Sequence, residues 1–302
     1  MKKIIKKIIK SYLSKNDQKI LNFFLEKKIY LNLCDIGSLG GMQKKWKLFE
    51  KLINFYDFEP QADVSSKNKF VLSNENNLDV DLNITKKLQC SSVLEPNINH
   101  LKRFKSVDRF EILKKEKFKT ITFDEFYADK NLDFIKIDCE GYEFEILQGA
   151  QEYLNKKYVL GLEVECEFFQ LRSNQALFWD IKNYLEKKGY IFYDFLKIIR
   201  WEKDQYSEMG QPQITDALFL KNPEKLIDDF KDEKIGKDVI LKYYLILSVF
   251  NKSDLIRYIN KSLDLNEKKY LDFVKQTSAK SNLLNKFRQL SRKIEMLFGR
   301  EI

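Results

Sequence analysis

The hydrophobic pattern alternates between short apolar runs and helical spacing over the first two thirds of the chain. Short apolar runs bounded by turn residues are typical of buried strands, and apolar residues three and four apart are typical of amphipathic helices. The pattern predicts strands at residues 30–36, 53–58, 70–73, 132–138, 158–165, 190–194 and 216–221, with 119–123 extended. It predicts helices at residues 16–29, 42–52, 142–155 and 175–188. This alternation indicates an α/β protein with a mainly parallel, doubly wound sheet.

The pattern changes to helix only beyond Pro223. Apolar residues recur at helical spacing in four further segments, at residues 236–250, 252–263, 266–278 and 281–298. We therefore expect three parts: an N-terminal helical segment at 1–29, a sheet domain at 30–221 and a C-terminal helical appendage at 222–302.

The first residues form an amphipathic pattern, with isoleucines on one helical face and lysines opposite. Two interpretations are open: a helix packed on the main domain, which we favour, or a peripheral membrane anchor. The segment has no uninterrupted apolar stretch, so it does not match a signal peptide. No run approaches the roughly 20 apolar residues of a transmembrane helix.

The chain is basic, with a formal net charge of +9, but the charge does not indicate nucleic-acid binding. Only eight of the 54 basic residues are Arg, the residue that dominates specific base and phosphate recognition. The lysines are spread along the chain. We expect no nucleic-acid partner, and at most a weak electrostatic contact with an acidic polymer or a membrane surface.

The four cysteines, Cys34, Cys90, Cys139 and Cys166, lack the spacing of a metal site. Cys34 and Cys139 each lie beside a strand-end Asp, and we expect their thiols to be packed and reduced, which suits a cytoplasmic protein.

Three predicted strands carry an acidic residue where a turn or helix begins. Asp35 lies at the end of the first strand, Glu59 follows the second and Asp138 ends the strand at 132–138. Because ligands of open α/β sheets bind at the carboxyl ends of strands, these carboxylates predict a nucleotide-type pocket.

The turn after Asp35 argues against a dinucleotide, because its glycines are spaced G-x-x-G-G and not G-x-G-x-x-G. A carboxylate leading into that turn would repel a pyrophosphate. It would attract a ligand with an ammonium and a sulfonium, such as S-adenosyl-L-methionine. Glu59 would then accept the ribose hydroxyls. The predicted cofactor-binding residues are Asp35, Gly37, Ser38, Gly40, Gly41, Glu59, Pro60 and Asp138.

Several segments resemble one family. Residues 134–150 are similar to the K-I-D-x-E-G-x-E-x-x-x-L-x-G-A motif of the FkbM-type methyltransferases. Residues 35–41 fill the family's first cofactor motif, and Phe58-Glu59-Pro60 fills its second. The resemblance covers about residues 30–221, because segments at 120–124, 161–168 and 215–220 fit as well.

The resemblance implies a Rossmann-like methyltransferase that uses S-adenosyl-L-methionine. It implies O-methylation of a hydroxyl on a sugar, a glycan or a natural-product acceptor. Ser38 and Leu39 differ from the family's common Ala-Asn, which puts a side-chain contact at residue 39 in question. The long polar connection at 74–118 is more often functional than idle, and we expect residues 86–105 to lie over the cofactor as part of the acceptor site.

Methyl transfer depends mainly on alignment, and a base near the acceptor hydroxyl assists it. Asp138 is the first candidate for that base, because it ends a strand beside the cofactor. Glu140 is the second, with the alternative role of a helix N-terminal acid. His100, the single histidine, is the third, against the alternative of a solvated loop residue. Glu163 and Glu165 share one strand face, where they either shape the acceptor site or end the strand in solvent.

Other classes of function remain open. Asp138, Glu140, Glu163 and Glu165 are ligand types that Mg²⁺ accepts, but no histidine joins them and methyl transfer requires no metal, so we predict none. A nicotinamide-dependent oxidoreductase is opposed by Asp35. A non-catalytic protein that docks through its C-terminal helices is opposed by the intact strand-end acids. An oligomer formed through those helices is compatible with their apolar stripes.

Overall fold

The computed structural model describes residues 18–37, 41–60, 70–105, 107–156, 158–203 and 210–265. The chain divides into two compact units. The sheet unit comprises Leu31–Gln43 and Ile53–Lys225, and the helical unit comprises Met1–Tyr30, Lys44–Leu52 and Leu226–Ile302. The predicted domain boundaries at residues 30 and 222 stay a prediction.

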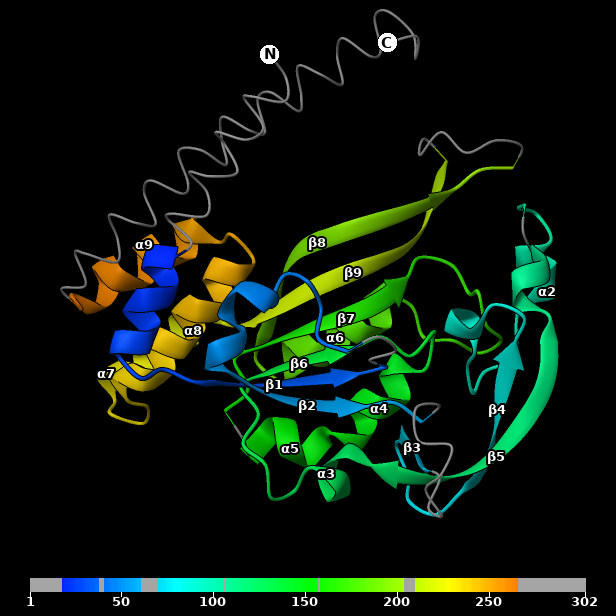
Figure 1. The fold of residues 1–302 in the computed structure, drawn as a ribbon, viewed down its shortest axis with the longest axis horizontal. Helices are drawn as coiled ribbons and strands as arrows, with labels where there is room; N and C mark the ends of the chain where they lie inside the picture. The colour runs from blue at the N-terminus through cyan, green and yellow to red at the C-terminus, as the bar shows by residue number, and fades with distance from the viewer. Residues whose placement is uncertain are drawn as a thin grey trace, which may run out of the picture. The chain divides into compact units, whose positions relative to one another are not determined.

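The sheet unit is built on a six-stranded sheet (Figure 1). Its strand order is β2-β1-β6-β7-β9-β8, and the first four strands run parallel to one another. β9 is antiparallel to both of its neighbours, so the sheet is mixed but mostly parallel, as predicted. The strands are β1 (Leu31–Ile36), β2 (Ile53–Phe58), β6 (Phe134–Ile137), β7 (Gly161–Glu167), β8 (Tyr190–Trp201) and β9 (Gln211–Lys221).

A second, three-stranded sheet occupies much of the connection that the sequence suggested was irregular. β3 (Phe70–Ser73) pairs in parallel with β5 (Ile112–Thr122), which pairs antiparallel with β4 (Asp79–Thr85). The sequence showed only local strand signals over 74–118 and an extended stretch at 119–123, so β4 and most of β5 were not assigned. Both strands contain charged residues, and Val71, Leu82, Ile84 and Phe118 form the apolar cluster of this sheet. The connection also contains the short helices η2 (Leu88–Cys90), α2 (Ile98–Leu101) and η3 (Val107–Phe110).

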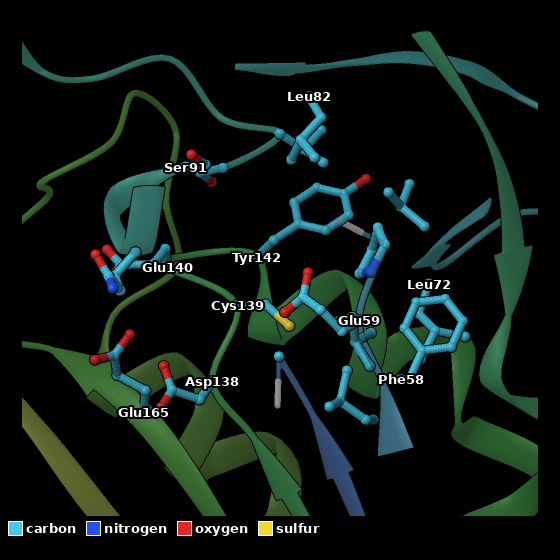
Figure 2. Close-up of a pocket in the computed structure, with 18 of the residues that line it drawn as sticks. Phe58, Glu59, Leu72, Leu82, Ser91, Asp138, Cys139, Glu140, Tyr142 and Glu165 are labelled. Atoms are coloured by element: carbon cyan, nitrogen blue, oxygen red, sulfur yellow. The ribbon is translucent and has the colours of Figure 1, made fainter. Parts of the chain in front are cut away.

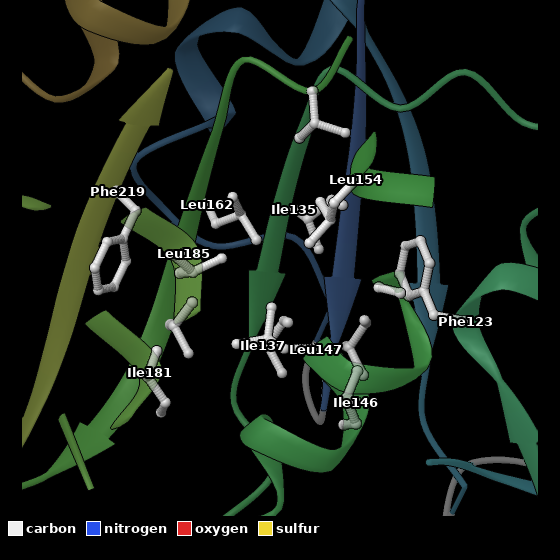
Figure 3. Close-up of a cluster of buried hydrophobic side chains, with 14 of the residues drawn as sticks. Phe123, Ile135, Ile137, Ile146, Leu147, Leu154, Leu162, Ile181, Leu185 and Phe219 are labelled. Carbon is white, nitrogen blue, oxygen red and sulfur yellow. The ribbon is translucent and has the colours of Figure 1, made fainter. Parts of the chain in front are cut away.

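The main core lies between the six-stranded sheet and four helices (Figure 3). These helices are α3 (Phe123–Phe126), α4 (Glu143–Gly149), α5 (Gln151–Lys156) and α6 (Phe178–Lys187). Ile135 and Ile137 of β6 and Leu162 of β7 meet Leu147 of α4 and Leu185 of α6 in one buried cluster. Burial of such side chains stabilises the fold by roughly 1.5–3 kcal/mol each.

The helix predicted at 142–155 is broken after Gly149. A Cβ atom at Gly149 would lie 1.9 Å from the carbonyl oxygen of Ser73, so this close contact between α4 and β3 requires glycine. The carboxylate of Asp124 accepts hydrogen bonds from the backbone N–H of Glu152 (3.0 Å) and Tyr153 (2.6 Å). Asp124 therefore caps a second helix, α5, where the sequence pattern suggested a continuation.

The helix predicted at 42–52 is instead a turn followed by the 3₁₀ helix η1 (Lys47–Leu52). The buried side chains nearby are Trp46, Phe49 and Leu52. Their spacing of three fits a 3₁₀ helix, which has 3.0 residues per turn, better than an α-helix.

The helical unit contains a helix over residues 18–26, together with α8 (Lys237–Val249) and α9 (Ser253–Leu263). α7 (Pro223–Lys231) begins where the sequence changes to helix only. The helices predicted at 266–278 and 281–298, and the amphipathic N-terminal pattern, lie outside the described residues. None of the helices within the described ranges combines the length and apolarity needed to span a bilayer.

Candidate active site

A cavity of about 270 Å³ opens in the sheet unit where β1, β2, β6 and β7 end (Figure 2). This is the edge at which open α/β sheets bind ligands. Residues from the three-stranded sheet and from the segment that follows its strand β4 complete the wall. The lining residues are Ile36, Gly37, Phe58, Glu59, Pro60, Val71, Leu72, Leu82, Leu88, Gln89, Ser91, Ser92, Val93, Asp138, Cys139, Glu140, Tyr142, Ile146 and Glu165.

Gly37 holds three strand ends together. Its φ is +80°, and its N–H donates a 2.9 Å hydrogen bond to the carbonyl of Phe58 at the end of β2. A Cβ atom there would lie 1.8 Å from the carbonyl oxygen of Asp138, so no other residue fits. Of the other predicted turn residues, Ser38 and Gly40 lie outside the described residues, and Gly41 has a φ of +73° but does not line the cavity.

Lys136 connects two of the predicted site carboxylates. Its Nζ lies 3.1 Å from Oδ1 of Asp35 and 3.0 Å from Oδ2 of Asp138. Burial lowers the pKa of Lys136, but the carboxylates of Asp138 and Asp35 outweigh it and raise that pKa above its usual value. Asp35 is 3% exposed and is not among the lining residues, whereas Asp138 lines the cavity.

The sequence interpretation gave Lys136 no role, although a signal was present. A lysine within the buried strand Phe-Ile-Lys-Ile requires a charged partner, because an unpaired ammonium is rarely buried. The partner follows from the register, since Asp35 of β1 lies directly opposite Lys136 of β6.

The turn after β6 carries its backbone in a left-handed conformation, with φ of +54° at Glu140 and +99° at Gly141. The buried carboxylate of Glu143 accepts hydrogen bonds from the N–H of Cys139 (2.7 Å) and of Gly141 (3.2 Å). Glu143 therefore fixes the turn, a task that the sequence did not reveal. Burial raises the pKa of Glu143 well above its usual value.

Glu140 lines the cavity and is held by a buried arginine. Arg172 Nη2 lies 2.9 Å from Oε2 of Glu140 and donates a 2.7 Å hydrogen bond to the carbonyl of Cys90. Burial raises the pKa of Glu140, Arg172 lowers it and Asp138 raises it, with a result of about 7. This pair joins the turn after β6 to the segment around Cys90.

The opposite end of the cavity is more apolar. Figure 2 shows Phe58, Glu59 and Leu72 toward one side, and Asp138, Glu140 and Glu165 toward the other. Phe58 packs edge-to-face on Phe126, with ring centroids 5.0 Å apart. Glu59 is thus a carboxylate beside an apolar surface.

Residues 86–105 were predicted to lie over the cofactor as part of the acceptor site. Only the first part of this range lies at the cavity. Leu88, Gln89, Ser91, Ser92 and Val93 line the cavity.

His100 lies elsewhere. It is 9% exposed, its Nε2 is 2.8 Å from Oε1 of Gln213, and its ring stacks on Phe169 with centroids 5.5 Å apart. It does not line the cavity and is not the solvated loop residue of the alternative interpretation.

Neither a metal cluster nor a disulfide occurs among the described residues. No group of three or more His, Cys, Asp or Glu side chains there is placed to hold a metal ion. The thiols of Cys34, Cys90, Cys139 and Cys166 are free.

Comparison with protein families agrees with this geometry. Residues 40–192, slightly more than half of the 302 residues, match the methyltransferase FkbM domain. The match includes Glu59, Asp138 and Glu140, which line the cavity. Comparisons with curated proteins and with solved structures gave no match. The resemblance predicted from the sequence motifs is thus confirmed, and the chain belongs to the FkbM methyltransferase family.

Proposed function

We propose that the protein transfers a methyl group from S-adenosyl-L-methionine to a hydroxyl of a sugar, glycan or natural-product acceptor. The observation that carries the proposal is the cavity at the strand ends, with Glu59 and Asp138 in its lining. The bound donor would supply an electrophilic methyl group on a sulfonium. The protein's own residues would bind and orient the donor and the acceptor and would exclude water.

The chemistry of the lining supports this donor. Glu59 follows β2 beside apolar side chains, where a carboxylate suits two ribose hydroxyls next to an aromatic base. Asp138 and Glu140 supply negative charge at the other end, which suits an ammonium and a sulfonium. The backbone of Gly37 and the side chain of Pro60, which both line the cavity, would complete the binding site.

The structure changes the role that we propose for Asp35. Because Asp35 is buried and paired with Lys136, it would not contact the donor. It would act as a positioning residue: Asp35 holds Lys136, and Lys136 holds Asp138.

The same proposal includes two narrower statements about the fold. We infer that the sheet is of the doubly wound type and that residues 222–302 form an appendage that supplies no catalytic group. The helices at the end of the chain would then serve packing or oligomer formation.

Titration calorimetry on the full-length protein tests the donor. We expect S-adenosyl-L-methionine and S-adenosylhomocysteine to bind, and NAD not to bind. Binding of NAD alone would favour the oxidoreductase alternative. Binding of none of the three would leave a non-catalytic protein on a methyltransferase fold and would refute the proposal.

A further inference from the structure

Glu165 is a buried carboxyl that points into the cavity from β7 (Figure 2). It lies on the same sheet face as Asp138, because Val164 pairs with Ile137 one residue earlier on the parallel strands. On the other side it pairs with Asp216 of the antiparallel strand β9. Glu165 is 8% exposed.

The other carboxylates at this end of the cavity have partners that hold them. Asp138 is 3.0 Å from Nζ of Lys136, and Glu140 is 2.9 Å from Nη2 of Arg172. In each pair one carboxylate oxygen already has a cation as its partner, and for Glu140 the effect of Arg172 opposes that of burial, with a pKa of about 7 as the result.

Glu165 differs from them in having an unsatisfied oxygen. Its Oε2 is buried and has no hydrogen-bond partner among the residues that the structure describes. A buried polar atom left without a partner costs roughly 1–3 kcal/mol, so such atoms in native proteins usually meet a ligand or an ordered water. In this cavity the missing partner would be a hydroxyl donor.

The surroundings also make Glu165 more basic than a surface carboxyl. Burial raises the pKa of Glu165, and the charges of Asp138, Glu140, Glu167 and Glu143 raise it further. Asp216 adds a further acidic group on the β9 side.

We propose that Glu165 is the catalytic base, the carboxyl that faces the transferred methyl group and accepts the hydroxyl proton of the acceptor. This rests on the proposed function. The acceptor oxygen would form the new C–O bond to the methyl carbon, while the electron pair of the C–S bond would stay on sulfur as a neutral thioether. The hydroxyl proton would pass to Oε2 of Glu165 and leave to solvent with product release.

The proposal has a consequence that needs no acceptor. A sulfonium beside Glu165 favours its carboxylate form, so that binding of the cationic donor should expel a proton from Glu165. S-adenosylhomocysteine has a neutral sulfur and should expel fewer protons. The excess released with S-adenosyl-L-methionine measures the titration of groups that face the methyl site.

The experiment counts protons by calorimetry near neutral pH, in two buffers of different ionisation enthalpy, with the full-length protein. The variant is Glu165→Gln, which keeps the shape of the side chain. The matched control is Glu167→Gln, on the same strand and also buried, but outside the cavity lining. Each variant removes one acidic neighbour of Glu140, so general effects on that residue are shared.

We expect Glu165→Gln to lose most of the excess proton release, and Glu167→Gln to keep it. An unchanged excess in Glu165→Gln would overturn the proposal while leaving the proposed function intact. Failure of the wild type to bind either donor compound would refute the proposed function itself.

A second measurement does not depend on the variant's folding. In the wild type, the excess should disappear at alkaline pH, where Glu165 is already ionised before the donor binds. An excess that persists there would also overturn the proposal.

Discussion

Replacing Lys136 with Met should destabilise the protein in a way that depends on pH. Lys136 is buried between Asp35 and Asp138, with its Nζ 3.1 Å and 3.0 Å from their oxygens. Methionine fills a similar volume but leaves Asp35, which is 3% exposed, without this cation. Removal of one partner from a buried ion pair costs about 3–5 kcal/mol in general.

Protonation of Asp35 in the variant sets an upper limit on the loss in free energy of unfolding. A buried carboxylate without its cation takes up a proton instead of staying charged. Protonating a carboxyl of ordinary pKa about 3.9 costs about 4 kcal/mol at pH 7 and about 1.5 kcal/mol at pH 5. Asp138 adds little, because a third of its side chain (33%) is exposed to solvent. We therefore expect a loss of about 3–4 kcal/mol at pH 7 and less than half of that at pH 5.

The sign of this pH dependence follows from proton binding. In the variant, the folded protein would hold a proton on Asp35 that the unfolded chain releases above pH of about 3.9. Its free energy of unfolding should thus fall, relative to the wild type, as the pH rises from there to neutrality.

Urea unfolding at pH 5 and pH 7 measures both quantities. Lys187→Met, at an exposed position of α6, is the control and should change stability by less than about 0.5 kcal/mol. Adding Asp35→Asn to Lys136→Met removes the buried carboxyl group of Asp35 and should recover stability at pH 7. A loss under about 1 kcal/mol, or one independent of pH, would show that Lys136 does not neutralise Asp35.

Three further predictions concern other parts of the sheet unit. Glu59→Ala should weaken binding of S-adenosyl-L-methionine by about 1–3 kcal/mol in calorimetry, because charge-assisted hydrogen bonds are lost. The control Glu125→Ala, at an exposed position, should leave the affinity unchanged, and equal affinities of the two variants would remove Glu59 from the site. Gly37→Ala should lower the melting temperature far more than Gly41→Ala, because both have positive φ but only Gly37 lacks room for a Cβ; similar losses would contradict the role of the contact with Asp138. Glu167→Gln should gain stability relative to the wild type as pH rises. Burial raises the pKa of Glu167 to about 8, so the wild type loses stability between a pH of about 4.3 and that value. Parallel curves of stability against pH for the two proteins would refute this.

Sequence patterns alone predicted several strands and two of the acids that line the cavity. The bounds of β2 and β3 agree with prediction, because both strands are short, rich in apolar residues and followed directly by a polar residue. Glu59 and Asp138 line the cavity, because the carboxyl ends of parallel strands meet at one edge wherever the strands lie in the chain. The family motif around Asp138 needed no structure either, since it is contiguous.

The partners of the buried polar side chains could not be predicted from local patterns, because the partners are distant in the sequence. Lys136 meets Asp35 across 101 residues of sequence, His100 meets Gln213 across 113, and Arg172 meets Glu140 across 32. The second sheet arises in the same way, since β3 is paired with β5 and not with its neighbour in sequence. Hydrophobic periodicity predicts only which side of a helix or strand a side chain faces, because that is set by the local backbone. Whether a buried carboxylate is paired or left to accept a proton is set by which distant strand lies beside it, and that is fixed when the chain packs.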